Sequence, residues 1–458
     1  GWTWDRMENV NKQIEKWTWD RYKRTERVIQ NGGQYTPYYA GFKIRVIFLF
    51  QVASFWPAQE SIYFNLLADP RFDVKLVCYD EPLDKTIKTE TAQQFLIKNA
   101  YNFISWNKFD ITDFNPHIIF LQTAYDTNRR NEFKSAQLRH KGVRVIYIPY
   151  GIEIADTIHA HTDHFRRDVL QNTWKVYTFS EMMRQDYIRY LPGKKDVCVL
   201  GMPRFDALYF RDRFLQMPEV IQKADRRKVV LWKVHFPKLI HENAQTILVT
   251  PYIREYIRFA VKLTQYNDLF FVFMPHPRFK EFNEDMTVKQ ELACLYSALE
   301  KADNVYIDDR DDYRNSLLNA DCIIVDRSAV MIEAGCVGVP VLYMYNPDYK
   351  EPMTKAVEPL IESYYQGTTC EDIEEFINMF REGEDPRKAQ REAAFAACVP
   401  YFDGKCGERI KEDIVRSLEQ EREMNPWTQT AQLAEKNAQL EARIARLEQE
   451  IAGKDANG

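Results

Sequence analysis

Residues 322–341 read CIIVDRSAVMIEAGCVGVPV, and this stretch decides the fold. Its first residues are uniformly apolar, as in a parallel strand that is buried on both faces. Asp326 and Arg327 then form a polar turn. Ser328 is a natural N-cap for the helix that follows, which carries Glu333. The pattern predicts one β/α unit, whose ligands bind beside the carboxyl end of the strand.

Apolar stretches of the same kind recur on both sides of this unit, separated by segments of helix length. Before Pro218 they cover 43–53, 72–80, 117–122, 143–151 and 174–180, and after it 228–234, 269–277, 304–309, 322–328 and 339–345. Each series is typical of a doubly wound α/β sheet. We therefore expect a GT-B fold, in which two Rossmann-like domains face each other across a cleft.

Four regions follow from this alternation. We predict a helical segment over 1–35, an acceptor domain over 36–215, a nucleotide-donor domain over 216–425 and a coiled coil over 426–458. The coiled coil is predicted from two series of heptad positions, which are Thr430, Asn437, Ile444 and Ile451, and Leu433, Leu440 and Leu447. Isoleucine, leucine and a single asparagine at these positions favour a parallel homodimer.

Composition excludes several classes of protein. The 458 residues carry a formal net charge of -5, so we expect no nucleic-acid partner. The eight cysteines form no C-x-x-C pair, which favours reduced thiols in a cytoplasmic protein over disulfides or a zinc site. No apolar run reaches the roughly 18 residues that cross a bilayer.

A peripheral contact with the inner face of the cell membrane is a separate expectation. Trp17 and Trp19 lie among basic residues such as Arg21 and Lys23, a mixture suited to an anionic interface. The alternative is that this helical segment packs on the protein's own body.

Two histidines end predicted strands of the second half. His276 lies in MPHPR with Arg278, and His235 lies in VHFP. A histidine and an arginine at this edge suit the negative charge of a leaving phosphate. The alternative for both histidines is a turn residue without a ligand.

The segment GMPRFDAL (201–208) joins the two halves. Its Gly-x-Pro sequence fixes a turn. We expect Arg204 and Asp206 to form an ion pair at this hinge, with Arg204 beside the cleft.

The ordered motifs G-x-P-R-x-D-x-L (201–208), P-H-P-R (275–278), D-x-S-x-V-x-x-E (326–333) and P-V-L-Y (340–343) follow one another along the chain. In this order they resemble the CDP-glycerol glycerophosphotransferase family, which includes teichoic acid polymerases and capsule enzymes. The resemblance spans roughly residues 40 to 420. It implies a GT-B fold and transfer of a polyol phosphate from a CDP-linked donor, or another NDP- or CMP-linked one.

The resemblance also implies roles for individual residues. His276 would lie by the donor pyrophosphate, and Ser328 with its neighbours would bind the phosphates. The position of Glu333, five residues after Ser328 in the helix, separately predicts that its carboxylate meets the ribose, or faces solvent beyond an ordinary β/α turn. The predicted donor-binding set is therefore Arg278, Asp326, Ser328, Ala329, Glu333 and His235. The nucleotide donor is the only cofactor expected, without an essential metal.

One departure from the family concerns its catalytic histidine. The family carries His-Gly-Thr at the end of an N-terminal strand, where this chain has Tyr150-Gly151-Ile152. An acceptor hydroxyl needs a positioned base, and we expect Glu153 and His161 to replace it. The neighbouring histidines His159 and His164 could instead suggest a metal site, which their spacing does not favour. Tyr150, Gly151 and Arg204 are the expected acceptor-side residues of the cleft.

Three classes of function fit these residues. The first is a transferase that adds a polyol phosphate or a sugar to a glycan or lipid-linked acceptor in bacterial surface-polymer synthesis. The second is another GT-B enzyme, such as a sugar-nucleotide glycosyltransferase or epimerase. The third is a scaffold that has lost activity, which the missing His-Gly-Thr would explain.

Overall fold

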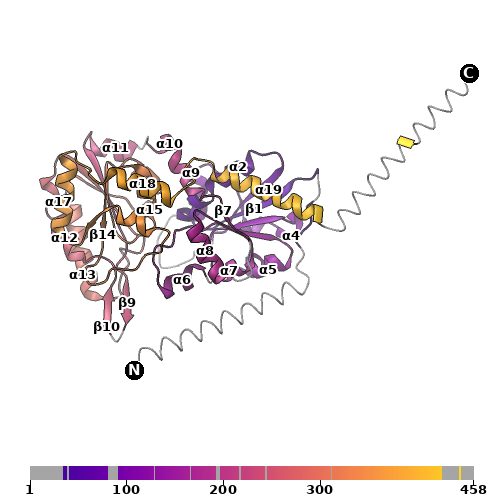
Figure 1. Cartoon of the computed structure of the whole chain (residues 1–458), viewed down its shortest axis with the longest axis horizontal. Helices are drawn as coiled ribbons and strands as arrows, with labels where there is room; N and C mark the ends of the chain where they lie inside the picture. The colour runs from indigo at the N-terminus through magenta and orange to yellow at the C-terminus, as the bar shows by residue number, and fades with distance from the viewer. Residues whose placement is uncertain are drawn as a thin grey trace, which may run out of the picture.

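The computed structural model shows two α/β domains side by side (Figure 1). It describes residues 35–38, 41–80, 91–127, 129–165, 167–191, 196–215, 218–242, 245–310, 312–424 and 443–444. The predicted helical segment before residue 35 lies outside the described residues. Of the predicted coiled coil, only residues 443–444 are described.

The N-terminal domain is built on a parallel sheet with the strand order β3-β2-β1-β4-β5-β6-β7. The strands are β1 (Ile44–Phe50), β2 (Phe72–Cys78), β3 (Ile104–Ser105), β4 (Ile118–Leu121), β5 (Arg144–Tyr147), β6 (Thr173–Thr178) and β7 (Val197–Val199). The order reverses between β1 and β4, which is where a doubly wound sheet opens a crevice at its carboxyl edge.

The C-terminal domain repeats this plan with the order β12-β11-β8-β13-β14-β15. Its strands are β8 (Lys228–Val234), β11 (Leu269–Pro275), β12 (Val305–Ile307), β13 (Cys322–Val325), β14 (Val341–Met344) and β15 (Tyr365–Gly367). The predicted GT-B architecture of two doubly wound sheets is confirmed. The sequence did not indicate the antiparallel hairpin β9 (Leu239–Glu242) and β10 (Gln245–Leu248), which projects from this domain (Figure 1).

Helices connect the strands of both domains. In the N-terminal half they are α2 (Glu60–Leu67), α3 (Ala92–Lys98), α4 (Ile111–Phe114), α5 (Ser135–His140), α6 (Ile158–Phe165), α7 (Asp168–Asn172), α8 (Glu181–Tyr190), α9 (Arg204–Tyr209) and α10 (Asp212–Leu215). The remainder are α11 (Pro218–Ala224), α12 (Ile253–Ala260), α13 (Met286–Glu300), α14 (Arg314–Leu318), α15 (Val330–Ala334), α16 (Glu358–Glu362), α17 (Cys370–Arg381), α18 (Lys388–Cys398) and α19 (Cys406–Met424). No helix among the described residues is long and apolar enough to span a membrane.

Alternate residues of each central strand face opposite sides of its sheet, and both sides are buried. In β1, Val46 and Phe48 pack in one cluster with α2, whereas Ile47 and Leu49 pack in another. That second cluster continues through Phe205 of α9 into the C-terminal domain. The two domains therefore share one hydrophobic core.

The last described helix, α19, lies on the N-terminal domain against α2 (Figure 1). Its Ile410, Ile414 and Leu418 are fully buried in the core of the N-terminal sheet. The predicted boundary at residue 425 assigned this helix to the C-terminal domain, and the structure corrects that. The start of α19 packs closely against Gly201. This position requires glycine, because its φ is 89° and a Cβ there would collide with Cys406.

Candidate active site

The loop after β5 carries the residues that stand where the family has His-Gly-Thr. Tyr150 stacks on Phe55, with ring centroids 3.8 Å apart, and its hydroxyl lies 2.8 Å from that of Tyr125. Burial raises the pKa of Tyr150 far above its usual range. Tyr150 therefore fills space at the cleft and does not supply the missing base, whereas Gly151 and Glu153 line a pocket directly beyond it.

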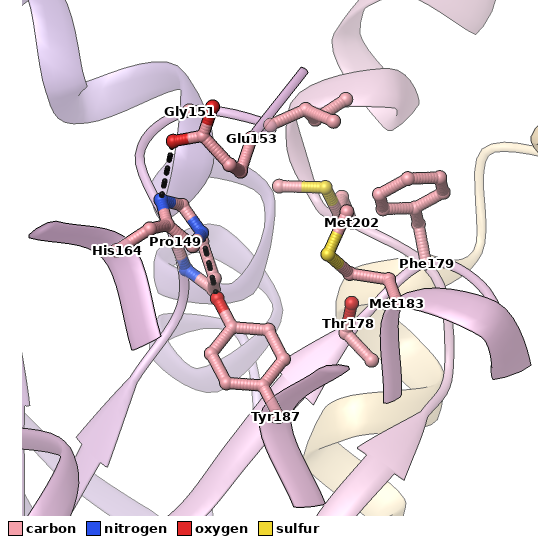
Figure 2. A pocket seen from close by; sticks show the side chains of 10 residues that line it. Pro149, Gly151, Glu153, His164, Thr178, Phe179, Met183, Tyr187 and Met202 are labelled. Atoms are coloured by element: carbon pink, nitrogen blue, oxygen red, sulfur yellow. Dashed lines mark hydrogen bonds and ion pairs between the residues drawn. The ribbon is translucent and has the colours of Figure 1, made fainter. Parts of the chain in front are cut away.

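This pocket lies at the carboxyl ends of β5 and β6 and encloses about 160 Å³, including space open to solvent. Figure 2 shows the His164 ring between Glu153 and Tyr187. The Nδ1 atom of His164 lies 3.9 Å from Oε2 of Glu153, and its Nε2 lies 3.0 Å from the hydroxyl of Tyr187. Met183 and Met202 are among the apolar residues that line the pocket.

Burial perturbs the titration of the polar residues in this pocket. It raises the pKa of Glu153, which is opposed by a hydrogen bond from the backbone N–H of Ala155 and by the charges of Arg327 and Lys238. Burial and the nearby His161 lower the pKa of His164 to about 4, so this imidazole is neutral at pH 7. The arrangement supplies a carboxylate with raised basicity beside a neutral histidine.

His161, predicted as a catalytic residue, does not line the pocket. Its Nδ1 lies 2.6 Å from the hydroxyl of Tyr190 and its Nε2 lies 2.9 Å from Asp156. Only 5% of the residue is exposed. His161 therefore packs α6 against α8, and His164, one helical turn further on, takes the position that we had expected for it. Which of the two histidines faces the pocket depends on the rotation of α6 about its axis, and the sequence pattern did not determine that rotation.

At the carboxyl edge of the C-terminal sheet, β8 and β11 bring His235 and His276 together. Their ring centroids lie 4.9 Å apart. The Nδ1 atom of His276 accepts a hydrogen bond of 3.1 Å from the backbone N–H of Arg278, so its proton is on Nε2. The Nδ1 atom of His235 lies 2.7 Å from the carbonyl oxygen of Phe236, which can only accept, so this ring carries its proton on Nδ1. The pair thus presents one hydrogen-bond donor, the Nε2–H of His276, and one acceptor, the Nε2 of His235.

Both rings of this pair are neutral at pH 7. Burial, with Lys233 and Arg278 nearby, lowers the pKa of His276 to about 3. Burial and the neighbouring His276 lower the pKa of His235 well below its usual value. Arg278 is exposed and lies over the ring of Phe236 at 4.7 Å, so it supplies a full positive charge beside the histidines.

Asp326, predicted to bind the donor, is only 1% exposed, and its carboxylate accepts hydrogen bonds from within the protein. It accepts hydrogen bonds of 2.7 Å from the backbone N–H of His235 and 3.0 Å from the hydroxyl of Tyr256. Burial raises the pKa of Asp326 to about 7 and lowers that of the adjacent Lys233 to about 8. Asp326 therefore holds the ends of β8 and β13 in place through these hydrogen bonds.

The turn after β13 remains partly exposed at Arg327, Ser328 and Ala329. Helix α15 begins at Val330 rather than at Ser328, and its N-cap is Ala329 without a side-chain cap. The hydroxyl of Ser328 accepts a bond of 3.3 Å from the N–H of Val330. The predicted serine cap is therefore wrong by one residue, and the helix is only five residues long.

Glu333 is fully buried and does not face a ribose site. Its Oε1 accepts hydrogen bonds of 2.9 Å from Nε of Arg204 and 2.5 Å from the hydroxyl of Tyr313. Arg204 also donates to the carbonyl oxygen of Tyr150 at 2.7 Å. The predicted ribose contact is corrected, because Glu333 joins α15 to the hinge and to the loop after β5.

Arg204 therefore pairs with Glu333 and not with Asp206. The carboxylate of Asp206 accepts hydrogen bonds from Ser61 and from the backbone N–H groups of Cys406 and Gly407, at 2.6 to 2.9 Å. Asp206 therefore caps the start of α19.

The two sides of the cleft meet at a backbone contact. Ala155 and Met353 form an antiparallel bridge, flanked by hydrogen bonds from Asp156 N–H to Pro352 and from Thr354 N–H to Ile154. Glu351, just before this contact, accepts from Arg327 at 2.5 Å and lies 3.5 Å from Lys238. The contact places the Glu153 loop beside Glu351, which holds Arg327 of the turn after β13. The sequence pointed to none of Glu351, Lys238 and Lys233, because no motif contains them.

Within the described ranges, no group of three or more His, Cys, Asp or Glu residues is arranged to hold a metal ion.

Solved structures share this architecture. The wall teichoic acid polymerase TagF matches with a TM-score of 0.56 at 11% identity, over 92% of this chain and 99% of that one. MnaA of S. aureus, solved with UDP, matches with a TM-score of 0.57 at 14% identity, over 82% of this chain and 97% of that one. UDP-GlcNAc 2-epimerase from Neisseria meningitidis matches with a TM-score of 0.54 at 15% identity, over 81% of this chain and 100% of that one. At these identities the likeness shows the fold.

No curated protein matches the sequence. A family model does match, over residues 111–416, and it covers the β5 loop, the hinge and the whole carboxyl edge of the C-terminal sheet. The matched range is about two thirds of the 458 residues. The chain therefore belongs to the CDP-glycerol:poly(glycerophosphate) glycerophosphotransferase family, a family of transferases.

Proposed function

We propose that this chain transfers a polyol phosphate from a CDP-linked donor to a hydroxyl group of a glycan or lipid-linked acceptor. The product would extend a bacterial surface polymer of the teichoic acid or capsule type. The acceptor oxygen attacks the phosphorus that carries the polyol, the bond from that phosphorus to the bridging oxygen breaks, and CMP leaves. The acceptor's proton passes to a base of the protein.

The observation that carries this proposal is the His235–His276 pair at the carboxyl ends of β8 and β11. The Nε2–H of neutral His276 is fixed by the bond between Arg278 and Nδ1, so it can donate to the departing phosphate oxygen. Arg278 and the partly exposed turn at Ser328 and Ala329 border the same edge. We assign the donor phosphates to this edge, and no longer assign the ribose to Glu333.

No cofactor other than the nucleotide donor enters this proposal, and no metal is essential to it. Fixed N–H donors and arginines meet the phosphate charge here, so transfer should persist in a chelator.

We further propose that the chain works at the inner face of the cell membrane, where a lipid-linked acceptor is held. Flotation with anionic liposomes, with and without residues 1–33, tests that contact.

The proposal is tested by incubating the chain with CDP-glycerol and a polyol-terminated acceptor, and measuring CMP release and product mass. CDP-ribitol and UDP- and CMP-linked sugars serve as competing donors in a thermal-shift screen. We expect stabilisation and turnover with a CDP-polyol. Stabilisation by a UDP-sugar alone, with no turnover of a CDP-polyol, would contradict the proposal.

His276→Ala is the informative variant. It should lower turnover by about 10²-fold, because it removes an N–H aimed at the leaving phosphate. His241→Ala is the matched control, since His241 lies exposed on β9. If His276→Ala keeps full turnover, His276 only shapes the turn.

A further inference from the structure

We infer that Glu153 is the general base for the acceptor hydroxyl, that His164 is its positioning residue, and that their pocket admits an uncharged, hydroxyl-bearing end group. The inference rests on the proposed transfer reaction. It concerns the part of the site in which this chain departs from its family, where Tyr150 occupies the place of the histidine.

The geometry leaves room for one hydroxyl oxygen between the two residues. Oε2 of Glu153 and Nδ1 of His164 are 3.9 Å apart, which is too far for a direct hydrogen bond. A point about 2.8 Å from both atoms exists at that separation, and 2.8 Å is the usual length of such hydrogen bonds. An acceptor oxygen placed there would give its proton to Oε2 while the imidazole N–H holds it in position.

The other atoms of both side chains are already committed. Oε1 of Glu153 accepts the backbone N–H of Ala155 at 2.8 Å, which fixes the carboxylate plane. Nε2 of His164 lies 3.0 Å from the Tyr187 hydroxyl, which is fully buried. When that hydroxyl donates to Nε2, the imidazole proton lies on Nδ1 and faces the pocket and Glu153 (Figure 2).

The lining of the pocket selects the kind of acceptor. None of the described residues that line it is lysine or arginine, and its one acidic group is Glu153. Met183, Met202 and Phe179 form an apolar side (Figure 2). A terminal phosphate entering here would meet a carboxylate without a cation in the lining, whereas a neutral polyol end would place its carbons on the methionines.

Charged residues of the C-terminal domain lie near this pocket. Across the cleft, Glu153 faces the charges of Arg327, Lys238 and Glu351. The bridge between Ala155 and Met353 fixes this approach, because it lies two residues from Glu153 and two from Glu351. A hydroxyl activated at Glu153 is therefore held near the turn after β13, to which we assign the donor phosphates.

The first experiment compares Glu153→Gln with wild type in the transfer assay, with CDP binding measured separately by calorimetry. We expect transfer to fall by about 10²-fold or more, because general-base catalysis contributes on this scale, with CDP affinity unchanged. Asp163→Asn, on the same helix as His164, is the control that should keep its rate. If wild type transfers and Glu153→Gln transfers equally well, the base lies elsewhere. If wild type itself transfers nothing from any CDP-polyol, the proposed function fails instead.

The second experiment tests His164 through the pH profile of kcat/KM. Asparagine places its amide nitrogen near the position of Nδ1, and glutamine places its own near Nε2. His164→Asn should keep the donor toward Glu153 and leave the acid limb of the profile in place. His164→Gln should lose it and move the acid limb to higher pH, because the carboxylate loses a nearby N–H dipole that favours its charged form. The groups that face Glu153, namely Arg327, Lys238, Glu351, Tyr150, Tyr187 and His164, are otherwise the same in both variants.

A purely structural histidine would lower the rate in both variants without moving the acid limb of the pH profile, and that result would overturn its positioning role.

The third experiment compares acceptors that end in a free polyol with acceptors that end in a phosphomonoester. Transfer to the polyol end is expected to be at least about 10-fold faster, since a repulsion of about 1.4 kcal/mol corresponds to this factor. Equal rates would refute the selection of an uncharged end.

Discussion

At the scale of single residues, Arg204 shows how one side chain can join three parts of the molecule. Its guanidinium contacts Glu333 on α15, Tyr313 before α14 and the carbonyl oxygen of Tyr150. Glu333 and Arg204 are both buried. A charge pair in such a place has given up its hydration, so its value lies in holding geometry and in the cost of breaking it.

Replacing Glu333 by alanine should therefore destabilise the protein before it affects nucleotide binding. The change leaves the Arg204 guanidinium buried without its carboxylate, which costs about 3 to 5 kcal/mol. Urea unfolding measures the difference. Glu300→Ala, at the exposed end of α13, is the control and should change stability by less than about 0.5 kcal/mol. A stable Glu333→Ala protein with weakened CDP binding would instead restore the ribose contact suggested by the motif.

The buried His117 predicts how the stability of the fold depends on pH. Only 2% of the residue is exposed, and its Nδ1 accepts the backbone N–H of Arg45 at 3.0 Å. Burial, with Arg45 and Arg144 nearby, lowers its pKa to about 4. Between that value and the unfolded pKa of about 6.5, the unfolded chain binds more protons than the folded one, so stability falls as the pH is lowered.

His117→Asn keeps an acceptor for the Arg45 N–H and removes this titration. Between pH 7 and pH 4.5 it should lose about 2.5 kcal/mol less stability than wild type does, since just under two pKa units are traversed at 1.36 kcal/mol each. Denaturant unfolding at the two pH values measures this, with the exposed His241→Asn as control. An equal acid loss in His117→Asn and wild type would show that His117 is not the group responsible.

At the scale of elements, long buried strands were predictable and local geometry was not. The strands β1, β8 and β11 follow long and mainly apolar runs, because both of their faces are covered. The two-residue β3 and the three-residue β7 and β15 lack such a run and were not predicted. In the same way, the sequence placed His276 at a strand end but could not tell whether His161 or His164 faces the pocket, since that depends on the rotation of α6.

The helix α19 yields a prediction at this scale. Ile414 is fully buried in the core of the N-terminal domain, although it follows the whole C-terminal domain in the chain. Ile414→Ala should therefore cost about 2 to 5 kcal/mol, as large-to-small changes in a core do. Urea unfolding provides the measurement, and Gln420→Ala, on the exposed side of α19, should be neutral. A loss below about 1 kcal/mol would mean that α19 is only loosely held, and the N-terminal domain would then not depend on it.

At the scale of the whole molecule, the cleft is crossed in several places, and most of them were invisible in the sequence. The hinge at Arg204 was recognised, but its partner Glu333 lies 129 residues away. The Ala155–Met353 bridge and the Glu351 contacts depend on how the two domains meet. Periodicity and strand-end motifs specify each domain separately, so they predict which edge carries chemistry and leave the pairing across the cleft undetermined.

The assembly of the whole chain is the remaining prediction. Its basis is the heptad pattern over residues 430–451, most of which lie outside the described residues. Leucine recurs at one heptad position, and Asn437 lies in the other series. An asparagine at a core position is tolerated when two copies pair across a parallel dimer and disfavours other registers. We therefore expect a parallel homodimer, which would hold two active sites near one polymeric acceptor and raise their local concentration.

Light scattering on the full chain and on a chain ending at Asn425 tests this prediction. The full chain should have twice the mass of one copy, and the shortened chain should be monomeric while keeping its transfer rate on a short acceptor. Asn437→Leu is the sharper variant. Removing a polar residue from a core position of the predicted coil relaxes the choice of register and number of strands, and should give larger or mixed assemblies. The heptads cover only a little over three repeats, so the dimer should dissociate on dilution more readily than a long coil does. A dimer that survives truncation at Asn425 would place the interface on the two α/β domains instead.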